Sequence, residues 1–175
     1  AGVCNAQGNE TLEKIKASGS ISQGVRDASG ALAYTLGNGS YAGFHYEVCT
    51  NIIRDIQKML GLAQLETKHV LVTSVNRIPL VKNGTVDIEC GSTTNNIARQ
   101  QEVAFANTLY VEEVRMAVRS DSKINSISDL NGKTVASSAG TTSIQLLRKN
   151  KRSQGLEFRE VNGKDHSDSF LFLES

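Results

Sequence analysis

The sequence has no tryptophan, a single proline and few aromatic residues, and its charges nearly cancel. With 19 Lys and Arg against 18 Asp and Glu, the formal net charge of +1 excludes a protein that binds nucleic acid through its overall charge. No window approaches the roughly 18 to 20 apolar residues that a membrane-spanning helix needs. The first residues also lack the basic and apolar regions of a signal peptide. We expect the mature form of an exported protein.

Cysteine is also scarce. The three cysteines, Cys4, Cys49 and Cys90, show no metal-ligand spacing and no C-x-x-C motif, which makes a structural zinc site improbable. No metal or cofactor is predicted. The count permits one disulfide and one free thiol without choosing the pair, and two buried, unpaired thiols at Cys49 and Cys90 fit equally well.

Helical and strand-like patterns alternate along the 175 residues, which are enough to bury a sizeable core. Helices are predicted at residues 11–18, 47–60, 77–83, 126–130 and 144–149, and strands at 21–26, 69–73, 86–90 and 133–137. Asn9 or Thr11 is the expected cap of the first helix, and residues 37–40 form a hairpin turn or loop. The βαβαβ order predicts an α/β fold with a mostly parallel sheet.

One run combines a strand end, polar side chains and a basic residue. After the apolar strand come Ser92, Thr93 and Thr94, then two asparagines, and Arg99 follows about one and a half helical turns later. A helix start with a nearby guanidinium can hold a carboxylate. The run also fits an ordinary capped surface helix with a solvated arginine, and it does not separate the two readings by itself.

A second polar turn at residues 138–143 repeats the order of strand, Gly and Thr, and helix start. It lacks the Gly-x-x-x-x-Gly-Lys pattern, which argues against a phosphate-binding loop. The favoured reading is two polar turns that face each other across a cleft.

Residues 73–96, TSVNRIPLVKNGTVDIECGSTTNN, closely resemble the glutamate/aspartate-type periplasmic binding proteins of bacterial ABC transporters. Further matches are TLEKI at 11–15, GF at 43–44, DLNGK at 129–133, GTTS at 140–143 and KDHSDSF at 164–170. The resemblance implies a periplasmic binding protein-like type II fold with two α/β lobes joined by a hinge. It places lobe 1 at residues 1–113, the hinge crossing at 114–118 and a partial lobe 2 at 119–175.

The resemblance also assigns an amino-acid site without catalytic residues. It implies that Arg99, with Ser92 and Thr94, holds the ligand's α-carboxylate, and that Ser138 and Thr141 add hydrogen bonds from the second lobe. It implies that Arg26, Arg77 and His166, with Ser74 beside them, surround the side-chain carboxylate. Each of these residues also has an ordinary surface role as its alternative, since lone arginines and histidines are common ion-pair partners.

The chain departs from the family pattern in two places. Relatives continue beyond Ser175 with an aspartate that holds the ligand's α-ammonium group, a second hinge crossing and further helices. In the first lobe, Leu32 stands where relatives have an aromatic packing surface. A shortened second lobe predicts a homodimer or an exchange of elements between chains, and the less favoured alternative is a small self-contained α/β unit.

The function that this resemblance implies is recognition of glutamate or aspartate for import through an ABC permease. One alternative is an enzyme on the same fold, similar to cyclohexadienyl dehydratase, with Glu89 or Asp168 as the acid or base. Another is a sensor or interaction module that uses hinge closure to present a surface to a partner.

Overall fold

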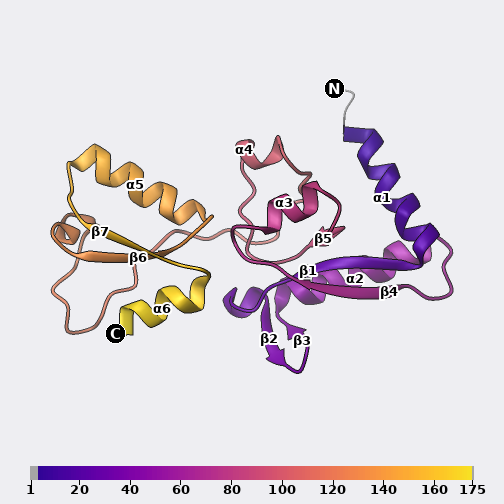
Figure 1. The fold of residues 1–175 in the computed structure, drawn as a ribbon, viewed down its shortest axis with the longest axis horizontal. Helices are drawn as coiled ribbons and strands as arrows, with labels where there is room; N and C mark the ends of the chain where they lie inside the picture. The colour runs from indigo at the N-terminus through magenta and orange to yellow at the C-terminus, as the bar shows by residue number, and fades with distance from the viewer. Residues whose placement is uncertain (1–3, 175) are drawn as a thin grey trace. The chain divides into compact units, whose positions relative to one another are not determined.

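The computed structural model describes residues 4–174, and the side chains of residues 10–174 (Figure 1). The chain divides into two compact units, Ala1–Asn107 and Thr108–Ser175. In the described part, none of the helices is both long and apolar enough to cross a membrane.

The first unit contains a three-stranded parallel sheet. Its strands are β1 (Ser20–Val25), β4 (Glu66–Leu71) and β5 (Ile88–Glu89), in the order β4-β1-β5. Both neighbours of β1 run parallel to it, which confirms the predicted sheet type. Two strands differ from the predicted ranges by more than one residue at an end: β4 begins earlier than residue 69, and β5 keeps only two of the five expected residues.

The helices of the first unit are α1 (Cys4–Ser18), α2 (Phe44–Met59), α3 (Arg77–Lys82) and α4 (Ile97–Gln100). The apolar faces of α1 and α2 meet β1 in a cluster built on Ile15, Ile21 and Ile53. The predicted first helix is the second half of α1. Because α1 begins at Cys4, the expectation that Asn9 or Thr11 caps it is wrong.

The turn at residues 37–40 is a β-hairpin. It joins β2 (Tyr34–Gly37) to β3 (Ser40–Ala42), and a short 3₁₀ helix, η1 (Gly30–Leu32), precedes it. Asn38 and Gly39 have φ of 54° and 75°. Positive φ at both central residues is the signature of the tight turn that fits the twist of a hairpin.

The segment from residue 104 to 119 contains no helix or strand. Its alternating apolar side chains are exposed, with Val111 at 86%. The segment includes the range in which the hinge crossing is predicted.

The second unit is also α/β. It contains η2 (Ile127–Leu130), β6 (Thr134–Ser138), α5 (Thr142–Gln154), β7 (Arg159–Gly163) and α6 (His166–Glu174). β6 and β7 pair in parallel, and α5 and α6 flank them (Figure 1). Leu130, Leu156 and Phe158 form the core. Sequence patterns do not predict β7 and α6.

Candidate functional site

The carboxyl ends of β1, β4 and β5 lie together at one end of the first unit's sheet. The chain passes from β1 to β4 on one side and then to β5 on the other, so the strand order reverses at β1. Open α/β sheets bind ligands at such a reversal, beyond the carboxyl ends of the strands. Arg26 follows β1, Ser74 lies three residues beyond β4, and Ser92 lies three residues beyond β5.

Arg26 is completely enclosed, with 0% of its surface exposed. Its Nε donates to Ser29 Oγ at 3.0 Å, its Nη1 to the Val72 carbonyl at 3.0 Å, and its Nη2 to Ser74 Oγ at 3.2 Å. The buried charge is therefore hydrogen-bonded to groups from the ends of two strands.

Ser92 joins this group through Ser29. The two hydroxyl oxygens lie 2.9 Å apart, so the end of β5 is tied to the end of β1. Arg26, Ser74 and Ser92, which were predicted from the sequence, thus lie in one hydrogen-bonded group. Ser29 was not predicted as a site residue. It lies near Leu32, in a segment where the sequence departs from the family pattern.

The loop after β5 is also fixed to α2. Cys49 of α2 and Cys90 form a disulfide, with their Cα atoms 5.9 Å apart. This excludes the alternative of two free thiols at these positions, while the side chain of Cys4 lies outside the described part. One turn earlier in α2, His45 Nδ1 lies 2.6 Å from the Gly91 carbonyl oxygen. Two links therefore hold the backbone that leads into Ser92.

Arg99 is buried, with 9% of its surface exposed. Its backbone N–H donates to Asn96 Oδ1 at 2.9 Å, so Asn96 caps α4, and its Nη1 donates to the Thr94 carbonyl at 3.0 Å. Burial lowers the pKa of the Arg99 guanidinium, and the charges of Glu89 and Glu102 oppose this. Helix α4 has only four residues, so a helix dipole adds little positive charge at this position.

Arg77 is the first residue of α3, and only 3% of its surface is exposed. It lies three residues after Ser74 in the chain. The first unit thus buries three guanidinium groups, those of Arg26, Arg77 and Arg99. The alternative that Arg99 is a solvated arginine on a surface helix is therefore wrong.

In the second unit, Ser138 is the centre of a polar cluster at the carboxyl end of β6. Its Oγ lies 2.8 Å from His166 Nδ1 and 2.9 Å from Ser169 Oγ. Thr141 Oγ1 donates to the Ser138 carbonyl at 2.8 Å and accepts from the Ile144 N–H at 3.3 Å, which caps α5. The structure thus groups Ser138, Thr141 and His166, and it adds Ser169, which was not predicted as a site residue.

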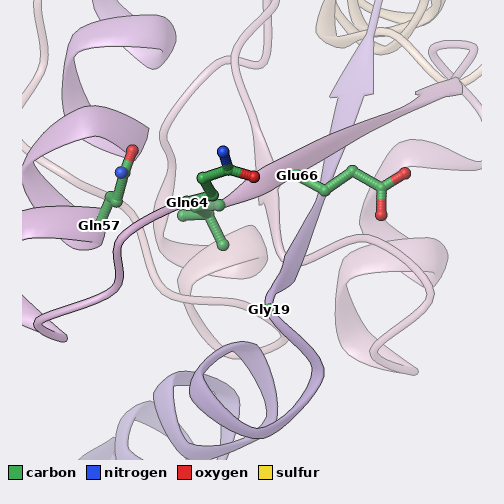
Figure 2. A pocket seen from close by; sticks show the side chains of 5 residues that line it. Gly19, Gln57, Gln64 and Glu66 are labelled. Carbon is green, nitrogen blue, oxygen red and sulfur yellow. The ribbon is translucent and has the colours of Figure 1, made fainter.

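A surface hollow lies at the opposite end of the first unit's sheet (Figure 2). Gly19, Gln57, Gln64, Leu65 and Glu66 line it, near the amino ends of β1 and β4. None of the predicted site residues borders this hollow. Among the side chains of residues 10–174, no group of His, Cys, Asp and Glu could hold a metal ion.

Residues 21–165 match the model of the bacterial extracellular solute-binding proteins, family 3. The chain belongs to this family. It is similar to the L-glutamate/L-aspartate-binding protein of Pseudomonas aeruginosa, with 42% identity over 94% of the chain and 55% of the relative. It is also similar to the glutamate/aspartate import solute-binding protein of Salmonella typhimurium, with 40% identity over the same shares. The chain therefore spans about half the length of these family members.

The fold of the family is confirmed by solved structures. One is an ancestral amino acid-binding protein, a precursor of cyclohexadienyl dehydratase, with a TM-score of 0.74 and 21% identity. The similarity covers 94% of this chain and 69% of that one. The predicted periplasmic binding protein-like type II fold is thus confirmed, and the chain contains part of it.

Proposed function

We propose that this chain carries the first lobe and part of the second lobe of a protein that binds glutamate or aspartate for ABC-type import. The observation that supports this most is the burial of Arg26, Arg77 and Arg99 in the first unit. A guanidinium group can hold both oxygens of a carboxylate. A dicarboxylate supplies two carboxylate groups, whereas a neutral or basic amino acid supplies one.

The proposed roles of the residues follow from their positions. Arg99, held by the Thr94 carbonyl, takes the α-carboxylate together with the hydroxyls of Ser92 and Thr94. Arg26 and Arg77, with Ser74, take the side-chain carboxylate.

Within the second unit, we propose a smaller group of ligand-binding residues. Ser138 and Thr141 supply hydroxyl groups, and His166 supplies a further donor for the side-chain carboxylate. The domain boundaries at 113 and 119, with the hinge crossing between them, are part of this proposal.

We propose no catalytic activity. Glu89 accepts a hydrogen bond from Thr93, and Asp168 accepts one from the Lys164 N–H, so both candidate acids have local structural partners. A general acid or base must instead reach the substrate within hydrogen-bonding distance.

The proposed location is the periplasm, and the proposed partner is an ABC permease. The Cys49–Cys90 disulfide fits an oxidising compartment of this kind. A homodimer is a further proposal. Light scattering after size exclusion, with and without glutamate, tests it, because a glutamate-stabilised dimer supports the proposal and a monomer in both conditions contradicts it.

Isothermal titration with glutamate, aspartate, glutamine and arginine tests the function directly. We expect heat of binding with the two acidic amino acids and much weaker binding of the other two. Equal binding of glutamine and glutamate would contradict the proposed selectivity. Turnover of a ligand would favour the enzyme, and binding of none of the four would favour the interaction module.

A further inference from the structure

Glu89 ends β5 and carries an unusual carboxylate. Its Oε2 accepts a hydrogen bond from Thr93 Oγ1 at 2.7 Å. Its Oε1 is buried and has no hydrogen-bond partner within the described part of the chain. A buried carboxylate oxygen without a donor is unfavourable unless nearby positive charge compensates it. Two cations, Arg26 and Arg99, lie near Glu89.

The first of these cations is Arg26. A Cβ atom added to Gly91 would collide with Glu89 Oε1 and would lie 2.6 Å from Arg26 Cγ. Glu89 Oε1 and the aliphatic part of Arg26 thus border the same small space beside Gly91. On the neighbouring strand, a Cβ atom at Gly24 would lie 3.2 Å from Glu89 Cγ. Because Gly24 and Gly91 have no Cβ atom, there is space for the Glu89 side chain between them.

The second cation is Arg99. Burial lowers the pKa of its guanidinium, and the charge of Glu89 opposes that shift more than the charge of Glu102 does. Glu102 is well exposed, and its carboxylate also lies 3.5 Å from the Lys82 ammonium. Glu89 is therefore the more enclosed of the two carboxylates that act on Arg99.

We propose that Glu89 is a specificity-determining residue, a counter-charge with a buried oxygen that lowers the positive charge around Arg26 and Arg99. A less positive site has a smaller preference for the more negatively charged ligand. This inference rests on the proposed function for its ligand, but the charge effect itself can be tested separately.

The first test replaces the charge and keeps the shape. Glu89→Gln retains an oxygen that can accept from Thr93 Oγ1 but removes the negative charge. Dissociation constants are measured for glutarate, glutamate and glutamine, whose net charges are −2, −1 and 0. We expect Glu89→Gln to favour glutarate over glutamine by about tenfold more than the wild type does. If all three affinities change by the same factor, Glu89 is only structural and the inference is wrong.

Two variants of Thr93 provide the matched comparison. Thr93→Val removes the hydrogen bond but leaves the Glu89 charge, so the ratio of glutarate to glutamine affinity is expected to stay at the wild-type value. Thr93→Lys places an ammonium group next to Glu89, so the ratio is expected to shift in the same direction as in Glu89→Gln. This variant keeps the test decisive if Glu89→Gln does not fold. A shifted ratio in Thr93→Val, or none in Thr93→Lys, would contradict the inference.

Sulfate separates this inference from the proposed function, because it probes the charge of the site without an amino-acid ligand. Tm is measured against sulfate concentration for the wild type and for Glu89→Gln. We expect a larger rise in Tm for Glu89→Gln, because the site then carries more positive charge. This result, with no binding of glutamate to the wild type, would reject the proposed ligand and retain the role of Glu89. Equal sulfate effects in the two proteins would reject that role.

Discussion

Ser29 and Ser92 lie with their hydroxyl oxygens 2.9 Å apart, although 63 positions separate them in the chain. Ser29 also accepts from Arg26 Nε, so a single hydroxyl group connects the enclosed guanidinium to the loop after β5. The uncharged Ser29 therefore helps to hold Arg26 and Ser92 in position.

Removing the Ser29 hydroxyl should weaken both connections. We expect Ser29→Ala to lower the free energy of unfolding by about 1 kcal/mol and to reduce the affinity for glutamate, because Arg26 and Ser92 lose their shared partner. Chemical denaturation and isothermal titration measure the two effects. Ser40→Ala, at an exposed position of strand β3, is the control. If both variants behave like the wild type, this connection is unimportant.

The disulfide should stabilise the first unit. Breaking the Cys49–Cys90 bond is expected to lower the free energy of unfolding by about 2–4 kcal/mol, because the unfolded chain gains freedom. Denaturation with and without dithiothreitol measures this. In the double variant Cys49→Ser, Cys90→Ser the reductant should have no further effect. A wild-type protein whose stability is insensitive to reduction would contradict the prediction.

Arg77 should select the ligand by its charge. We expect Arg77→Ala to reduce binding of glutamate by far more than binding of glutamine, because only glutamate places a second carboxylate in the site. Isothermal titration with both ligands measures the difference, and circular dichroism checks the fold. Arg54→Ala removes an exposed arginine from α2 and serves as the control. The prediction fails if both ligands lose the same factor.

Thr141 should stabilise helix α5 through its cap. Thr141→Ala is expected to lower the stability of the second unit by about 1 kcal/mol, because the Ile144 N–H and the Ser138 carbonyl both lose a partner. Hydrogen exchange of the first α5 amides reports this locally. Thr141→Ser keeps the hydroxyl and should protect these amides nearly as well as the wild type. Equal exchange in the two variants would mean that the cap is not important.

The sequence predicts the parts of the fold that have a strong local signal. Helix α2 was recognisable because apolar residues such as Ile53 and Ile56 recur on one face, and the hairpin because glycines flank Asn38. Strand β7 and helix α6 have weaker patterns. Polar residues fill much of β7, and the exposed Phe170 and Phe172 do not form the spacing of a one-sided helix.

Contacts between distant residues are harder to predict than elements. The sequence shows Cys49 and Cys90 but does not give the distance between them, so the disulfide remained undecided until the fold was known. Arg26 was proposed as a site residue from the family resemblance. That its guanidinium is enclosed by Ser29, Val72 and Ser74 depends on how two strand ends meet, which no local pattern specifies.

The two apolar clusters, one built on Ile15, Ile21 and Ile53 and the other on Leu130, Leu156 and Phe158, share no residues. Each unit thus draws its core from its own part of the chain. A cavity made in one cluster should be felt first as a loss of order in that unit. Core residues of one cluster can therefore be substituted while the residues of the other cluster are kept unchanged.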